Sequence, residues 1–204
     1  MPKIVDKDAK RLSLIEAAAI VFAREGFART KMAHIAAEAC VGKGTLYEYF
    51  ASKNELFLSV CEHCVHWPED ASAFAANPKA GLRGLILALV ESYERASGFF
   101  SILIDYWSVV IRDPDEHGQM FLARGADFYG PPLALLSEVV SAGQADGRLR
   151  GDADPRRTAQ IIIAGIEGLR LQRAITPPGF DLANAVSEFA DLILRDLTVE
   201  GHER

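Results

Sequence analysis

The sequence predicts an all-α protein of about nine helices. Apolar residues recur at helical spacing through nearly all of the 204 residues, and alternating β-branched runs are missing. Glycines and prolines mark the ends of the periodic segments, and Asp or Ser residues suited to N-caps stand at several of the starts. We therefore expect a protein built from helices alone.

The first helix is expected to run from about Asp8 to Glu25 and to stop at Gly26, because glycine readily adopts the conformation that ends a helix. Phe27 follows this stop, and its ring is expected in the core. The apolar stripe predicted for this helix contains Leu12, Ile15, Ala19 and Phe22.

Two short helices are expected next, over residues 31–39 and 43–50, with a tight turn framed by Cys40 and Gly42 between them. Thr30 is the expected N-cap of the first, with Ile35, Ala36 and Ala39 facing inward. Two helices of about eight residues, joined by a turn of three or four and braced by a longer helix, describe a helix-turn-helix unit. Ser52 and Glu55 have capping-box spacing and predict the start of a fourth helix.

The stretch "VGKGTLYEYF", residues 41–50, suggests phosphate binding. A nucleotide-binding loop is excluded, because Ala37 stands where a glycine is needed, Gly44 follows Lys43 in place of Ser or Thr, and no strand precedes it. In a recognition helix, Lys43 and Gly44 lie at the N-terminus, where free N–H groups favour a DNA phosphate. Thr45 can offer a hydroxyl and a methyl group to base edges.

The aromatic residues of this helix have two interpretations. Tyr47 and Tyr49 can donate from their phenols to phosphates, or they can be core aromatics of a small helical domain. Leu46 and Phe50, four residues apart, are expected to hold the helix on its own core.

Charge is unevenly distributed along the chain. The formal net charge is −6, but residues 1–53 hold nine Lys and Arg against six Asp and Glu, and the remaining residues hold 13 against 22. A mildly basic head on an acidic body is typical of a small DNA-reading module joined to a larger domain with another task.

The segment "RTKMAHIAAEACVGKGTLYEYFASKNELF", residues 29–57, resembles the TetR family of transcriptional regulators. A weaker likeness, "GRLRGDADPRRTAQIIIAGIEGLRLQ" at residues 147–172, is similar to the family's last-but-one helix. Cys40 stands where the family commonly has glycine, and Gly42 stands where serine often caps the recognition helix. We expect an awkward backbone conformation at Cys40 and a cap without a side-chain hydrogen bond at Gly42.

The resemblance implies a helix-turn-helix DNA-binding domain over residues 1–55 and a helical ligand-binding and dimerisation domain over residues 56–204. It implies a homodimer, paired through its last two helices, that binds double-stranded DNA at a near-palindromic site and most often acts as a repressor released by a small-molecule inducer. The expected DNA contacts are Thr30, Lys43, Gly44, Thr45, Tyr47, Tyr49 and Lys53.

The resemblance also implies an inducer cavity among the middle helices. Eight residues are candidates to line it: Tyr93, Phe100, Leu103, Trp107, Met120, Phe121, Phe128 and Tyr129. Polar groups from Asp105, His117, Arg124 or Arg170 can complement them. An aromatic stripe is equally typical of plain core, so the alternative function is a DNA-binding regulator controlled by protein contacts without such a cavity.

The C-terminal half carries several helix signals. Asp113, Pro114 and Glu116 are expected to open a helix that kinks or breaks at "YGPP", residues 129–132. Asp154 with Pro155 caps the penultimate helix, in which Gly165 and Gly168 indicate close approach by another helix. Asp181 caps the last helix, whose expected stripe contains Leu182, Val186, Phe189, Ala190, Ile193, Leu194 and Leu197.

A helical enzyme is the competing class, but no Cys-His or Ser-His arrangement, carboxylate pair or metal spacing stands out, and no cofactor is expected. On a helix, Cys61 and His63 lie roughly 160° apart, so "CEHCVH" does not converge on one metal ion, and a metal or redox role needs partners from elsewhere. Cys64 is expected as a buried small hydrophobe. Without an apolar run of about 18 residues or a signal-peptide core, a cytoplasmic protein is expected.

Overall fold

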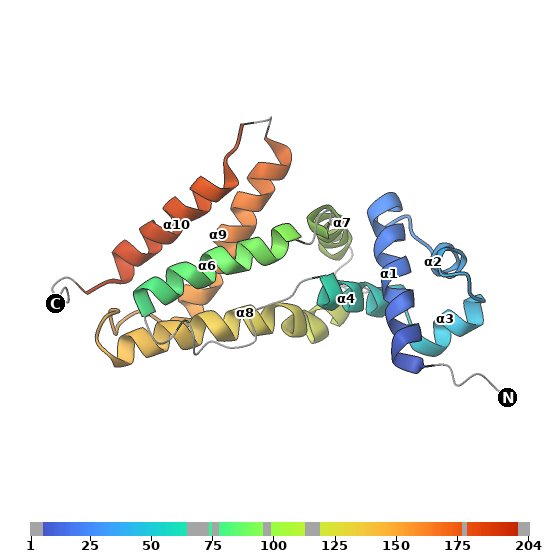
Figure 1. The fold of residues 1–204 in the computed structure, drawn as a ribbon, viewed down its shortest axis with the longest axis horizontal. Helices are drawn as coiled ribbons and strands as arrows, with labels where there is room; N and C mark the ends of the chain where they lie inside the picture. The colour runs from blue at the N-terminus through green and yellow to red at the C-terminus, as the bar shows by residue number, and fades with distance from the viewer. Residues whose placement is uncertain are drawn as a thin grey trace. The chain divides into compact units, whose positions relative to one another are not determined.

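The computed structural model describes residues 6–64, 74, 78–95, 99–112, 119–176 and 179–199 (Figure 1). Within these ranges the protein consists of nine helices, with no strand beyond an isolated antiparallel bridge between Leu149 and Thr198, which confirms the all-α prediction. The chain divides into two compact units. The first joins residues up to 66 with residues 95–128, and the second joins residues 67–94 with the chain from 129 onward.

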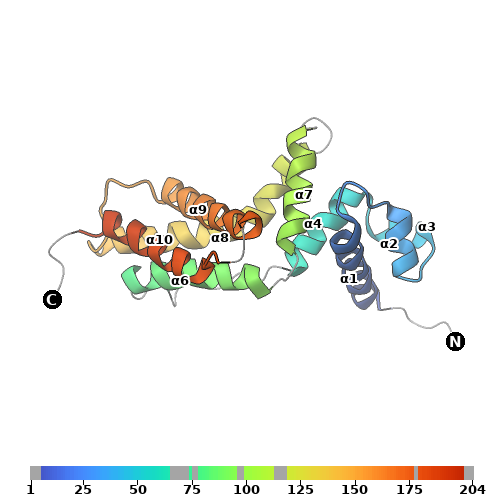
Figure 2. The same ribbon diagram turned by 90° about the horizontal axis from the view of Figure 1, so that it is seen from above.

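The first unit begins with four helices: α1 (Lys7–Glu25), α2 (Met32–Glu38), α3 (Lys43–Tyr49) and α4 (Lys53–Cys64). α1 contacts both α2 and α4, and α3 contacts α2 (Figure 2). The unit also contains α7 (Phe99–Arg112), which contacts α1, and the beginning of α8 (Gln119–Ala145).

An aromatic cluster forms the core of this unit. Phe27, 1% exposed, packs against Phe22 and Phe57 with ring centroids 5.6 and 5.0 Å away. Tyr106 of α7 stacks on Phe57 at 4.1 Å and meets Phe27 edge-on at 4.8 Å. The predicted core position of Phe27 is confirmed, and α7 contributes to the core beneath the helix-turn-helix.

The apolar stripe predicted for α1 is wrong in part. Leu12 is 42% exposed and Ala19 is half-buried. The buried residues are Leu14, Ile15, Ala17, Ala18, Val21 and Phe22. Because α1 packs against three helices, its buried face is wider than one stripe and is rotated away from Leu12.

The turn between α2 and α3 has the expected features. Cys40 has φ +53°, and it is the one non-glycine residue with positive φ among those described. Gly42 is the N-cap of α3 and makes no side-chain hydrogen bond. The N–H groups of Cys40 and Val41 donate to the carbonyls of Ala37 and Ala36, so hydrogen bonds close the turn despite the unfavourable conformation of Cys40.

The predicted capping box of α4 is confirmed. The Glu55 N–H donates to Ser52 Oγ over 3.1 Å, and Glu55 Oε2 accepts from the Ala51 N–H over 2.8 Å. The hydrogen bond to the Glu55 carboxylate thus comes from the residue before Ser52 and not from the N–H of Ser52 itself. Both bonds fix the turn by which α3 passes into α4.

The second unit contains α6 (Pro78–Arg95) except for its last residue, most of α8, α9 (Pro155–Ile175) and α10 (Leu182–Leu197). Asp154 accepts from the N–H groups of Arg156 and Arg157, and Asp181 accepts from that of Asn184, so both predicted caps are confirmed. α9 and α10 pack against each other (Figure 1).

The sequence predicts a kink or a break at residues 129–132, and the helix is not broken there. α8 continues through Pro131 and Pro132, which both lie inside the helix. Two adjacent prolines remove N–H donors from one turn only, and the helix resumes beyond it. The helix start expected at residues 113–116 lies outside the described residues.

Close approach by another helix is confirmed at Gly165 and is not found at Gly168 among the described residues. A Cβ atom on Gly165 would collide with the ring of Phe189 from α10, whereas one on Gly168 would meet nothing within 4 Å among the described residues. In the predicted stripe of α10, Leu182, Val186, Ala190 and Leu197 are buried; Phe189, Ile193 and Leu194 are half-buried in the single chain.

Candidate nucleic-acid interface

α3 is attached to the head by its apolar residues and presents its polar ones. Leu46 and Phe50 are fully buried, as predicted. Lys43 and Gly44 are exposed, Thr45 and Tyr49 are half-buried, and Tyr47 is 45% exposed. The interpretation of Tyr47 as a core aromatic is therefore excluded.

The polar side chains of α3 have no hydrogen-bond or ion-pair partner in the part of the chain that the structure describes. Within the described ranges, the side chains of Lys43, Thr45, Tyr47 and Tyr49 make no hydrogen bond or ion pair. Lys43 Nζ lies 5.7 Å from the centre of the Tyr47 ring, which is a weak attraction at an exposed site. One ammonium and three hydroxyl groups within seven residues thus have no hydrogen-bond or ion-pair partner among the described residues.

Gly42 and Gly44 give the same end of α3 an open backbone. A Cβ atom on either residue would meet no described atom within 4 Å. Internal packing therefore does not require a glycine at position 44. Glycine is also unfavourable inside a helix, so its presence there is not explained by the stability of α3. Its absent side chain leaves room for another molecule to approach the backbone.

Thr30 is not placed as predicted. Lys31 is the N-cap of α2, and Thr30 is 1% exposed. Its hydroxyl donates to the Gly26 carbonyl over 2.7 Å. The loop folds back on the end of α1, so the side chain of Thr30 serves this loop and is not available to DNA in this conformation.

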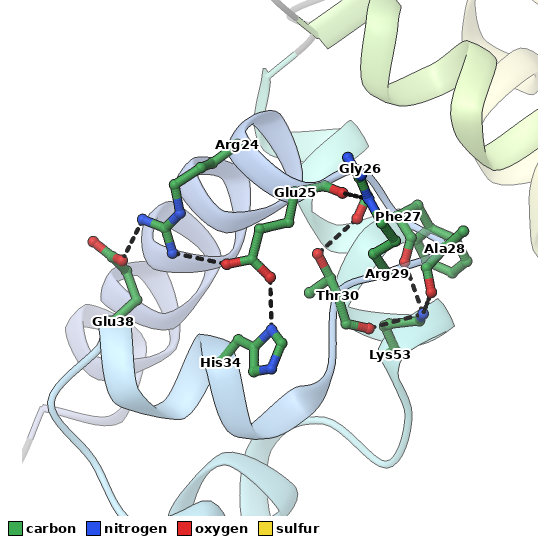
Figure 3. Close-up of polar contacts among 10 residues, drawn as sticks. All are labelled: Arg24, Glu25, Gly26, Phe27, Ala28, Arg29, Thr30, His34, Glu38 and Lys53. Atoms are coloured by element: carbon green, nitrogen blue, oxygen red, sulfur yellow. Dashed lines mark hydrogen bonds and ion pairs between the residues drawn. The ribbon is translucent and has the colours of Figure 1, made fainter.

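Lys53 is also used internally. Its ammonium donates to the carbonyls of Phe27 and Thr30 over 2.7 and 3.0 Å and lies 3.4 Å from that of Ala28 (Figure 3). It lies 4.3 Å from the centre of the Phe27 ring. Burial lowers the pKa of Lys53, and the charge of Asp105 opposes this shift. The ammonium at the start of α4 is thus compensated by carbonyl oxygens of the preceding loop.

A charged clasp joins α1 to α2. His34 Nδ1 lies 2.6 Å from Glu25 Oε2, and Arg24 bridges Glu25 and Glu38 over 3.0 and 2.9 Å (Figure 3). The hydrogen bond from His34, followed by that from Arg24, lowers the pKa of Glu25. The clasp links α2 to the end of α1 through exposed side chains, in addition to the buried contacts of Ile35 and Ala36.

The candidate ligand residues fall into three groups. Phe100 and Trp107 are half-buried, with ring centroids 6.5 Å apart and edge-on; Leu103 is 1% exposed. Tyr129, in the second unit, donates from its hydroxyl to Glu167 over 2.7 Å. The side chains of Tyr93, Met120, Phe121, Phe128, His117 and Arg124 lie outside the described part.

Two of the polar candidates are internal. Asp105 accepts a hydrogen bond from the Ala28 N–H, and Arg170 is 2% exposed. Leu103 is likewise a core residue. The contacts of Asp105 place it beneath the head and not in a cavity for a ligand.

The predicted burial of Cys64 is wrong in part. Cys61 is the buried residue, at 1% exposure, and burial raises its pKa well above the ordinary value. Cys64 is half-buried. No group of three His, Cys, Asp or Glu residues in the described ranges is arranged to hold a metal ion. None of the helices, over those same ranges, is long and apolar enough to cross a membrane.

A three-helix head with an exposed, polar second helix of a helix-turn-helix defines the class of DNA-binding regulators. Sequence comparison agrees: residues 14–60 match the family described as "Bacterial regulatory proteins, tetR family", and residues 78–197 match "BetI-type transcriptional repressor, C-terminal". The chain belongs to the TetR family of transcriptional regulators.

Named relatives are similar along most of the chain. The HTH-type transcriptional regulator BetI of Paraburkholderia xenovorans is 24% identical over 202 residues, covering 95% of this chain and 98% of the relative. The HTH-type transcriptional repressor NicS of Pseudomonas putida is 29% identical over 152 residues, covering 71% and 68%. These relatives are transcriptional regulators and not enzymes, and this protein is a DNA-binding regulator like them.

Solved structures share the fold. The crystal structure of NalD, described as the secondary repressor of the MexAB-OprM multidrug efflux pump in Pseudomonas aeruginosa, aligns with a TM-score of 0.74 at 23% identity over 96% of this chain and 99% of NalD. SmeT, the repressor of the Stenotrophomonas maltophilia multidrug efflux pump SmeDEF, aligns with a TM-score of 0.66 at 20% identity over 94% and 91%.

The sequence does not identify Arg11 as a supporting residue, and it assigns Asp105 to the inducer cavity and not to the support of the head. Arg11 on α1 lies 5.0 Å from the centre of the Phe50 ring and donates to Ser59 over 2.9 Å, so it joins α1 to the end of α3 and to the middle of α4. Asp105 reaches the loop after α1 from 77 residues away in the sequence. An acidic residue on an apolar helix is a weak signal, because its partner here is a backbone N–H group that no sequence pattern identifies.

Proposed function

We propose that the protein is a homodimeric repressor that reads a near-palindromic operator with α3 and is released by a small-molecule inducer. The observation that carries the DNA-reading part is the set of side-chain donors on α3 that make no hydrogen bond or ion pair among the described residues. Within this set, Lys43, Tyr47 and Tyr49 are proposed phosphate contacts and Thr45 is the proposed base contact. Gly44 is proposed to allow the backbone to come close to DNA.

The proposed dimer is supported by an exposed apolar face on α9. Ile161, Leu171 and Ile175 are 53%, 40% and 67% exposed, and exposed Ala164 and Gly168 lie between them. At about 100° per residue these five positions fall within about 80° of one another on the helix. On α10, Leu192 is 58% exposed. Two copies that pair through these helices bury the apolar face and present two copies of α3.

The repressor part of the proposal rests on the relatives. NicS, NalD and SmeT are each described as a repressor, and NalD and SmeT as repressors of multidrug efflux pumps. An inducer that prefers the geometry in which the two heads do not match the half-sites lowers DNA affinity by its differential affinity for the two states. Phe100 and Trp107 are the described aromatic residues proposed to contact it.

The test is selection of bound duplexes from random DNA with the full-length protein, followed by measurement of how many chains bind each selected duplex. The expected result is an inverted repeat with half-site centres about 34 Å apart, or a multiple, bound by an even number of chains. A selected site without two-fold symmetry, bound by a single chain, would contradict the proposal.

A further inference from the structure

Three side chains hold the loop between α1 and α2, residues 26–30: one from the loop itself, one from α4 and one from α7. Lys53 binds three of its carbonyl oxygens from the start of α4. The Thr30 hydroxyl donates to the Gly26 carbonyl inside the loop. The Ala28 N–H donates to Asp105 Oδ2 over 3.0 Å. Most polar groups of this backbone therefore have a fixed partner, although it is the entrance to the helix-turn-helix.

Asp105 is the member of this set that comes from α7. A Cβ atom on Gly26, which has φ +78°, would lie 3.0 Å from Asp105 Oδ2, so the carboxylate lies directly against the loop backbone. The next residue, Tyr106, packs edge-on to Phe27 in the same loop and stacks on Phe57 of α4. Two consecutive residues of α7 thus contact the loop, one by a charged hydrogen bond and one by a ring.

Lys53 and Asp105 act on the same few peptide groups with opposite charges. The Lys53 ammonium donates to the carbonyl oxygens of Phe27 and Thr30, which precede and follow Ala28. The Asp105 carboxylate accepts from the Ala28 N–H between them. Hydrogen bonds in which one partner is ionised are roughly twice as strong as neutral ones. The loop conformation, and with it the first residues of α2, depends on this pair.

We propose that Asp105 and Lys53 are positioning residues for operator binding, which hold the helix-turn-helix in its DNA-reading arrangement without touching DNA. The inference rests on the proposed function of α3. If the loop is released, the DNA-reading arrangement of the helix-turn-helix becomes one of several conformations. The apparent affinity for the operator then falls in proportion to the fraction of molecules that adopt it. Because the number of phosphate contacts is unchanged, the dependence of affinity on salt is unchanged.

Three full-length variants test this: Asp105→Ala, Asp105→Asn and Lys53→Met. Binding to the selected operator is measured over a range of salt, at a temperature at which melting curves show every variant fully folded. Below the melting transition, lost stability alone leaves the folded fraction near one and the affinity unchanged. Asp105→Asn is the conservative variant, because its amide oxygen can still accept from the Ala28 N–H.

The expected result for Asp105→Ala and Lys53→Met is binding about tenfold weaker than wild type with the same log–log salt slope, and Asp105→Asn is expected to restore most of the affinity. Wild-type affinity in Asp105→Ala would overturn the inference. A slope reduced in magnitude by about one in Lys53→Met would also overturn it, since it would make Lys53 a phosphate contact. Wild-type protein that selects no operator sinks the proposed function instead, which keeps the two failures distinct.

Discussion

α3 and α9 both have exposed side chains among the described residues, but the two surfaces differ in chemistry. α3 carries exposed Lys43 and Tyr47 and half-buried Thr45 and Tyr49, whereas the exposed face of α9 carries isoleucine and leucine around exposed glycine and alanine. A surface of charged and hydroxyl donors suits a hydrated polyanion such as DNA. An apolar face with small residues suits another protein surface of the same kind. The comparison predicts that substitutions on the two helices separate DNA binding from self-association.

The largest expected effect is on the dimer. Ile161→Glu places a charge on the apolar face of α9 and should raise the dimer dissociation constant by more than about 100-fold, because an unpaired charge in an apolar interface costs several kcal/mol. Ile20→Glu on α1 is the matched control, since Ile20 and Ile161 are both 53% exposed. Sedimentation equilibrium measures both. Equal weakening in the two variants, or none in Ile161→Glu, would contradict the assignment of α9.

Alanine substitutions at Gly165 and Gly168 of α9 should change the free energy of unfolding with opposite signs in a protein that does not dimerise. On an Ile161→Glu background, Gly165→Ala should lower the free energy of unfolding by about 1–3 kcal/mol, because the added methyl group overpacks Phe189. Gly168→Ala should raise it by up to about 1 kcal/mol, because alanine favours the helix and the site is open. Urea unfolding followed by circular dichroism measures both. Changes of the same sign would show that the packing between α9 and α10 differs from that described.

Gly44→Ala should affect stability and DNA binding with opposite signs. The methyl group meets nothing within 4 Å, so the head should be stabilised by a few tenths of a kcal/mol to about 1 kcal/mol. If DNA lies against this backbone, the same methyl group should weaken operator binding by several-fold. Thermal melting and operator titration on one preparation measure the two effects. A variant more stable than wild type that binds with unchanged affinity would remove Gly44 from the interface.

The smallest expected effect concerns pH in the second unit. Burial raises the pKa of Glu167, opposed by the hydrogen bond from Tyr129 and the charge of Arg170. The folded protein therefore holds this proton more tightly than the unfolded chain, so wild type loses stability as pH rises from about 4.5 through the folded pKa. Glu167→Gln keeps an oxygen acceptor for Tyr129 and should show a smaller loss. Melting between pH 4 and 8 measures it, with Glu138→Gln, an exposed glutamate on α8, as control.

Most of the head could be predicted from local sequence, and its supports could not. Gly26, the Ser52–Glu55 capping box and the positive φ of Cys40 depend on neighbours within a few residues, and short motifs report them well. Lys53 and Thr30 were assigned to DNA by their place in the family motif. Their partners are backbone carbonyls of a folded loop, which become visible only when the loop is built.

The body was less predictable for the same reason. The caps Asp154 and Asp181 are local and were found, whereas the role of Asp105 depends on a contact with residue 28. The two prolines of α8 indicate a kink or a break, but the helix is continuous, because tertiary packing of a long helix can outweigh the bonds lost in one turn.

The most direct test of the claim that α3 reads DNA is the salt dependence of operator binding by Lys43→Ala. Lys43 is exposed at the first position of α3 and makes no ion pair within the described ranges. Arg195→Ala, which removes an exposed cation from α10, is the control. The account predicts a log–log slope reduced in magnitude by about one per chain in Lys43→Ala and unchanged in Arg195→Ala. A wild-type slope and affinity in Lys43→Ala would mean that DNA is bound elsewhere on the protein.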